Sequence, residues 1–212
     1  MAASVSPAAR VTVIGGVQVD VIMSPVTELP RAGASLLADQ MSMRLGGAGA
    51  NAALAFAEAG MPVRLMGCIG DDHLGNWMRE ELAPYGLGRD LAVVPGGRSG
   101  LTVALQSPER DRTFLTYLGV NLDWGADLIP EEVLRCQNLL LCDYFMTPGL
   151  QGDQARRLLH AAKAHGARTF FDTAWDPANF PEHTRDQVLA LLPGVDLRIV
   201  ADRTQREREA KK

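Results

Sequence analysis

A cluster of glycines opens directly into a run of strong helix formers near residue 50, and this junction constrains the fold most. The cluster reads Gly46-Gly47-Ala48-Gly49-Ala50-Asn51, and residues 52–59 after it are mostly alanine. Gly60 then ends the run, as a C-terminal cap does. We therefore predict a helix over 51–59 that is preceded directly by a glycine-rich loop. Such a loop lets a small polar or anionic ligand approach backbone N–H groups closely.

Apolar strand-like runs alternate with helix-like runs along most of the chain. The predicted buried strands are 11–14, 63–69, 139–141, 169–171 and 197–200, and the predicted helices are 51–59, 74–85, 130–136, 150–165 and 184–192. This alternation is typical of a parallel sheet covered on both faces, so we predict an α/β fold. Two segments, about 18–45 and 100–118, instead alternate polar and apolar residues and predict antiparallel strands with one exposed face.

Composition excludes several classes of function. A net charge of −4 over 212 residues offers no basic surface for nucleic acid. No apolar run approaches the ~20 residues that span a bilayer, and the N-terminus does not have the pattern of a signal peptide. Cys68, Cys136 and Cys142 lie in or beside apolar segments without metal-ligand spacing. We expect buried free thiols, a cytoplasmic protein, no metal site, and neither a nucleic-acid nor a membrane partner.

The glycine cluster fits two families of ligand-binding loop. Gly47-x-Gly49-x-x-Ala52 matches the fingerprint of the dinucleotide-binding fold, and Asp71 and Asp72 lie about 20 residues further on. That fingerprint must follow a buried parallel strand, whereas residues 38–44 alternate polar and apolar. The hypothesis that the chain is a nicotinamide-dependent oxidoreductase therefore rests on this fingerprint alone.

The second family explains more of the chain. The pattern Gly46-Gly47-x-Gly49-x-Asn51-x-Ala53, followed by Gly60 and Gly70, resembles the N-terminal signature of the ribokinase-like (PfkB) carbohydrate kinases. Further similar segments are 15–20, 69–75, 112–114, 119–121 and 144–149, so the resemblance covers about residues 10–198. It implies the N-terminal two-thirds of a ribokinase-like sandwich, with a mostly parallel central sheet, a small β-strand lid formed by 18–45 and 100–118, and a homodimer contact through the lid. We divide the chain into a flexible N-terminus (1–9), an α/β domain (10–200) and a charged tail (201–212).

The resemblance also implies an activity, phosphoryl transfer from Mg-ATP to a sugar hydroxyl, and a set of substrate contacts. The expected contacts are Asp20, Gly46, Gly47, Asn51, Asp143 and Arg112. Carboxylates accept hydrogen bonds from paired hydroxyls, an amide both donates and accepts, and the planar fork of an arginine binds phosphate or carboxylate. Each residue also has a purely structural alternative, such as a turn, a helix cap or a solvated charge. Asp172 and Asp176 are as readily explained by turns or caps.

The catalytic Asp and the phosphate-binding loop of the family lie in a second signature, of the Gly-Ala-Gly-Asp type, which does not occur in this sequence. We therefore expect no catalytic residue in this chain, an incomplete nucleotide site, and a C-terminal part lost by truncation or a frame shift. One alternative is a nucleoside kinase of the same family, with Met41, Met43 and Phe114 lining a base. The other is a non-catalytic sugar-binding or dimerising fragment.

Overall fold

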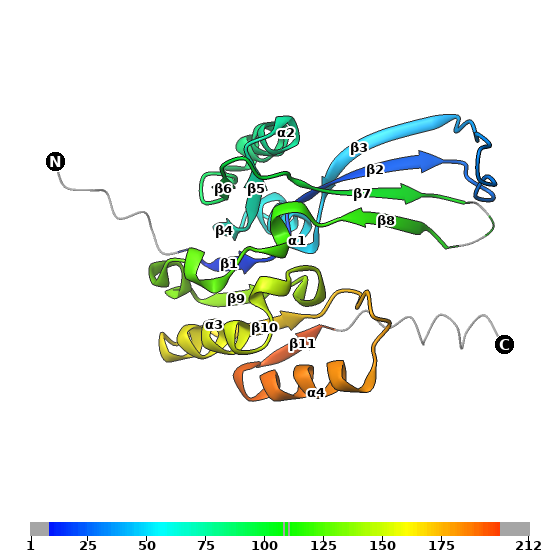
Figure 1. Cartoon of the computed structure of the whole chain (residues 1–212). Coiled ribbons are helices and arrows are strands. Elements are labelled where there is room, and N and C mark those ends of the chain that lie inside the picture. The colour runs from blue at the N-terminus through cyan, green and yellow to red at the C-terminus, as the bar shows by residue number, and fades with distance from the viewer. Residues whose placement is uncertain (1–8, 108, 110, 200–212) are drawn as a thin grey trace.

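The computed structural model describes residues 9–107, 109 and 111–199, and it shows a central sheet with helices and a separate lid sheet that projects from it (Figure 1). The expectations for a flexible N-terminus and a charged tail fall almost entirely outside these residues. The described α-helices are α1 (Ala48–Glu58), α2 (His73–Leu82), α3 (Asp153–Ala164) and α4 (Glu182–Leu191). They match four of the five predicted helices, with boundaries shifted by a few residues.

The central sheet is parallel and has five strands in the order β11-β10-β9-β1-β4. Their bounds are β1 (Val11–Ile14), β4 (Val63–Met66), β9 (Asn138–Leu141), β10 (Arg168–Asp172) and β11 (Leu197–Ile199). Leu141 and Phe171 pack with Leu159 of α3 and Val188 of α4 in one buried cluster. Val13 of β1 and Ala53 of α1 belong to a second buried cluster. The predicted α/β class with a mostly parallel sheet is thus confirmed.

Two predicted elements differ in the structure. The single strand expected over 63–69 is broken at Gly67 into β4 and β5 (Cys68–Gly70), and β5 pairs with β6 (Ala92–Val94) in a separate sheet. A Cβ on Gly67 would lie 2.6 Å from a methyl of Val17, so a larger residue would have to displace that side chain where the chain leaves the main sheet. The helix expected over 130–136 is a short 3₁₀ segment, η4 (Glu131–Leu134). So short a segment gains few i→i−4 bonds to offset the cost of nucleating an α-helix.

The lid is a four-stranded sheet in the order β3-β2-β7-β8. Its strands are β2 (Gln18–Ser24), β3 (Gln40–Gly46), β7 (Gly100–Leu105) and β8 (Thr113–Tyr117). The pairs β2–β3 and β7–β8 are antiparallel as predicted, whereas β2 and β7 pair in parallel. The prediction of wholly antiparallel strands is wrong at this junction because the chain returns to the lid through α2 and β5–β6 rather than through a hairpin.

The register of the lid separates a polar face from an apolar one. Asp20 lies opposite Thr102, which in turn lies opposite Thr116, so these three side chains share one face. The other face carries a row of four apolar residues, one from each strand: Val21, Met43, Val103 and Leu115. Phe114 belongs to the polar face, whereas Met41 and Met43 belong to the apolar one.

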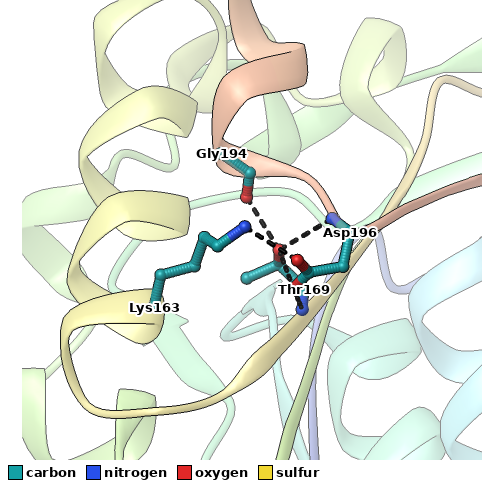
Figure 2. Close-up of polar contacts among 4 residues, drawn as sticks. All are labelled: Lys163, Thr169, Gly194 and Asp196. Atoms are coloured by element: carbon teal, nitrogen blue, oxygen red, sulfur yellow. Dashed lines mark hydrogen bonds and ion pairs between the residues drawn. The ribbon is translucent and has the colours of Figure 1, made fainter.

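A polar cluster holds the end of the central sheet together (Figure 2). The Thr169 hydroxyl lies 2.7 Å from the carbonyl oxygen of Gly194, to which it donates, and the Thr169 amide donates to Asp196 Oδ2 at 2.8 Å. Lys163 Nζ of α3 donates to Asp196 Oδ1 at 2.8 Å. The hydrogen bond from Lys163, with that from the Thr169 amide, lowers the pKa of Asp196 to about 2. The cluster thereby joins α3 and β10 to the segment that leads into β11.

Candidate functional site

A cavity of about 690 Å³ lies between the polar face of the lid and the loops that follow β9 and β10. From the lid and its flanks it is lined by Gln18, Asp20, Thr102, Arg112, Phe114, Thr116 and Leu118, and from the body of the protein by Met146, Ala174, Trp175 and Pro177. Its size falls within the ~300–1,000 Å³ usual for small-molecule sites. Parallel α/β sheets bind ligands beyond the carboxyl ends of their strands, which is where the loops after β9 and β10 lie.

Asp20 is the acidic group of this cavity. It lies within β2, and its Oδ1 accepts a hydrogen bond from Gln18 Nε2 at 3.3 Å. Gln18 Nε2 also lies 2.7 Å from Thr102 Oγ1, and the hydroxyls of Thr102 and Thr116 are 2.9 Å apart. Burial raises the pKa of Asp20, while the bond from Gln18 and the charge of Arg112 oppose that rise. A connected row of polar groups therefore faces the cavity around a partly desolvated carboxyl group.

Gly46 gives the Asp20 carboxylate its space. A Cβ at Gly46 would overlap the Asp20 carboxyl group, so any other residue at this position would displace it. The sequence predicted that Gly46 and Asp20 belong to one site, and the structure places them in contact at the end of β3. The contribution of Gly46 is thus steric room beside the acid.

The remaining glycines of the cluster let two loops approach closely. Gly47 has a left-handed φ of 84° and is the N-cap of α1, and a Cβ there would collide with the carbonyl oxygen of Gly16. A Cβ on Gly49 would lie 2.6 Å from the carbonyl carbon of Gly15. The turn between β1 and β2 therefore packs backbone to backbone against the start of α1. This contact fixes the glycine loop relative to β2 and Asp20.

Asp143 anchors this junction from the loop after β9. Its Oδ2 accepts hydrogen bonds from the amides of Gly16 at 3.1 Å, Ala48 at 2.6 Å and Gly49 at 3.2 Å. Since Gly47 has no side chain with which to cap α1, Asp143 provides the acceptor for two amides of the first turn. Burial raises the pKa of Asp143 to about 6, the amide hydrogen bonds oppose the rise, and the charge of Asp172 adds to it. Asp143 thus lies beneath the glycine loop, with its carboxylate directed at backbone amides.

Asn51 occupies the first turn of α1, where its amide donates to the Gly47 carbonyl at 3.1 Å. Its side chain is exposed and is not among those that line the cavity. The structure therefore brings Asp20, Gly46 and Arg112 together, and it brings Asp143 to the glycine loop. Asn51 lies one helical turn beyond that loop.

Several cavity residues were not predicted as site residues, namely Gln18, Thr102, Thr116, Met146 and Trp175. Gln18 carried a usable signal, because it lies two residues before Asp20 in a strand and so shares its face. Thr102 and Thr116 needed the cross-strand register, which the sequence does not contain. Asp172 accepts a hydrogen bond from the amide of Ala174 at 3.2 Å. It therefore stabilises a turn beside the cavity, which is the structural alternative to ligand binding that the sequence indicates. Asp176 likewise accepts from the amides of Ala178 and Phe180.

Comparison with protein families decides the assignment. The family described as pfkB family carbohydrate kinase matches residues 8–204. The chain belongs to the pfkB carbohydrate kinases. This membership confirms the resemblance found in the sequence and excludes the dinucleotide-binding hypothesis, in agreement with the structure. The glycine loop follows the lid strand β3, and Asp72 accepts from the Gly75 amide at 2.8 Å as the N-cap of α2.

Individual pfkB relatives show the same fold over part of their length. Ribokinase of Bacillus subtilis (strain 168) is 32% identical over 115 residues, which are 54% of this chain and 39% of that protein. Ribokinase from Giardia lamblia superposes with a TM-score of 0.74 at 18% identity, covering 91% of this chain and 57% of that one. Ribokinase from Cryptococcus neoformans, solved in complex with ADP, gives a TM-score of 0.61 at 27% identity, covering 80% and 51%. The chain thus spans about two-fifths of the length of the Bacillus subtilis enzyme.

Among the residues that the structure describes, every helix is too short or too polar to cross a membrane. The three cysteines are buried and form no disulfide. Burial raises the pKa of the Cys68 thiol to about 12, and the nearby charge of Asp123 adds to the rise. These thiols are therefore protonated and unreactive at neutral pH.

Proposed function

We propose that this chain binds a monosaccharide in the lid cavity and presents one of its hydroxyls for phosphoryl transfer from ATP and Mg²⁺. The observation that carries the proposal is the polar row of Asp20, Gln18, Thr102 and Thr116, which faces a cavity of small-molecule size beyond the carboxyl ends of parallel strands. The name of the Bacillus subtilis relative and the ADP bound by the Cryptococcus neoformans relative support this combination of sugar and nucleotide.

The proposed contacts follow from the chemistry of each side chain. The two carboxylate oxygens of Asp20 accept from adjacent sugar hydroxyls, while Gln18 and Thr102 hold the carboxylate in position. Gly46 leaves room for the Asp20 carboxylate beside the sugar, whereas Gly47 and Asn51 lie outside the cavity lining and are not proposed as contacts. Asp143 holds the glycine loop against the turn before β2 and so helps to position Asp20.

The contribution of the described residues to phosphoryl transfer is to bind and position the sugar. No group of three or more histidine, cysteine or acidic side chains that could hold a metal ion occurs among residues 9–107, 109 and 111–199. The described residues therefore form no cage of side chains around a metal ion, and we propose that Mg²⁺ enters with the phosphates of ATP. The lid cavity is proposed to orient the sugar, while the general base and the donors to the phosphates are proposed to come from outside the cavity. We place the protein in the cytoplasm, with which its protonated free thiols are consistent.

Isothermal titration calorimetry with the whole chain tests the sugar site. Asp20→Asn should weaken binding of the preferred sugar about tenfold or more, because a charge-assisted hydrogen bond contributes ~1.5–3 kcal/mol. Asp39→Asn is the control, since Asp39 is exposed and outside the cavity. Pentoses, hexoses and nucleosides are compared in the same titrations. Equal affinity in both variants, or no binding of any sugar, would refute the proposal.

Tighter binding of nucleosides than of sugars would instead favour a nucleoside kinase. Phe114 is the only member of the apolar set proposed for a base that lines the cavity. Met41 and Met43 lie on the opposite face of the lid, because side chains alternate between the faces of a strand. The cavity therefore supports the sugar better than the nucleoside.

We also propose that the apolar face of the lid pairs with a second copy of this chain. Met41, Leu115 and Tyr117 on that face are 65%, 60% and 55% exposed. Apolar groups of this size on edge strands favour association. Light scattering should show a dimer of the 22.8 kDa chain at high micromolar concentration, and Leu115→Glu should yield a monomer. Ser42→Glu, on the polar face of β3, is the matched control. A wild-type monomer would refute this part of the proposal.

A further inference from the structure

The lid cavity contains groups of both charges. Asp20 lies within β2, and Arg112 lies just before β8 on the same polar side of the lid. Arg112 takes part in none of the ion pairs found among the described residues, and its positive charge is felt at the Asp20 carboxyl group. Within the described part of the chain, the cavity thus has an acidic group with polar partners and a cation without an acidic partner in direct contact.

Arg112 is held by an aromatic ring. Its guanidinium carbon lies 5.5 Å from the ring centroid of Phe114, which itself lines the cavity. Stacking on an aromatic face orders the guanidinium plane while it leaves the edge of the plane, with its N–H donors, available. Trp175 contributes a further aromatic surface to the same cavity. An arginine ordered in this way is suited to bind a planar or tetrahedral anion through two parallel hydrogen bonds.

We propose that the substrate of the lid cavity is an anionic sugar, whose carboxylate or phosphate binds Arg112 while its hydroxyls bind Asp20. This inference rests on the proposed sugar site and adds the chemical class of its substrate. A neutral sugar would leave the donors of Arg112 without an anionic partner. The negative charge of Asp20 disfavours an anion beside it, so the two charges also determine which way round the substrate binds.

The experiment compares three ligands on the whole chain by isothermal titration calorimetry: a neutral hexose, the corresponding aldonate and the corresponding hexose monophosphate. At least one of the two anionic ligands should bind about tenfold or more tightly than the neutral hexose. Whichever of the two binds more tightly identifies the anion. Because Arg112 is exposed, this advantage should shrink between about 50 and 300 mM salt, as expected for a screened ion pair.

Arg112→Gln should remove the advantage, with a loss of about 10- to 100-fold for the anionic ligand and little change for the neutral hexose. Arg112→Lys should retain part of it, since a lysine keeps the charge without the planar fork. Arg44→Gln is the matched control, because Arg44 lies opposite Asp20 on the same sheet face but does not line the cavity.

The possible failures are distinguishable. Equal or tighter binding of the neutral hexose, or an Arg112→Gln variant that keeps the full preference for the anionic ligand, would overturn the inference and leave the sugar site standing. Absence of binding for all three ligands would overturn the sugar site itself, and the inference with it. An equal loss of anionic binding in Arg44→Gln would show a diffuse charge effect and would also overturn the assignment to Arg112.

Discussion

Replacing Asp143 by asparagine should change the pH dependence of stability in a way that reports its burial beneath the glycine loop. The folded protein raises the pKa of Asp143 from 3.8 to about 6, chiefly by burial. Because the ionised form is disfavoured in the fold, its contribution to stability is greatest below pH 4 and is lost as the pH rises through 6. At about 1.4 kcal/mol per pH unit, the whole effect is about 3 kcal/mol, of which about 2 kcal/mol falls between pH 4.5 and 7.5.

Urea denaturation of both proteins across that pH range measures the effect. The free energy of unfolding of the wild type, minus that of Asp143→Asn, should fall by about 2 kcal/mol from pH 4.5 to 7.5. Taking this difference cancels the contributions to the pH dependence from the carboxyl groups that the two proteins share. These include Asp20 and Asp172, whose pKa values burial also raises. Asp72→Asn is the control. Hydrogen bonds from Ser99 and Gly75 outweigh burial and lower the pKa of Asp72, so its difference should be flat above pH 4.5.

Amide chemical shifts test the same contact directly. The signals of Gly16, Ala48 and Gly49 should titrate together with a midpoint near pH 6, because all three amides donate to Asp143 Oδ2. In Asp143→Asn this shared transition should disappear. A stability difference that does not vary with pH, or amides that titrate only below pH 4.5, would show that burial does not dominate the pKa of Asp143. Amides that do not titrate together would show that its carboxylate does not anchor the loop.

Three further predictions address the packing, the sheet edge and the activity. Gly49→Ala should destabilise the protein by about 1–3 kcal/mol in urea, since its Cβ would press on the backbone of Gly15, and an unchanged denaturation midpoint would contradict the loop contact. Thr169→Val should cost about 1–3 kcal/mol through the buried bonds it removes, whereas Lys163→Met should cost ~0–1 kcal/mol because that ion pair is partly exposed; the opposite ranking would refute the assignment. In a coupled assay of ADP release, this chain should remain far below the ~1–100 turnovers per second of ordinary kinases, and turnover in that range would place a base within the lid cavity.

Much of the scaffold could be predicted from local sequence patterns. The parallel strands β1, β9 and β10, the helices α1 to α4 and the lid strands all follow from apolar periodicity and from punctuation by glycine. The cap of α2 is equally local, because Asp72 accepts from the amide of Gly75, three residues further along the sequence. The pattern from Gly46 to Gly70 also indicated the pfkB family, which the family comparison confirmed.

The site itself depended on contacts between distant residues. Asp143 is separated from the amides that it binds by 94 to 127 positions, and Gln18 is separated from Thr102 by 84. Periodicity predicts which side of a strand is polar, but it does not specify which strand becomes its neighbour or in what register. The parallel pairing of β2 with β7 made that choice, and it placed Thr102 and Thr116 beside Asp20. Pairing is selected by burial and backbone hydrogen bonding summed over the whole chain, so only the tertiary structure could reveal the cavity that it forms.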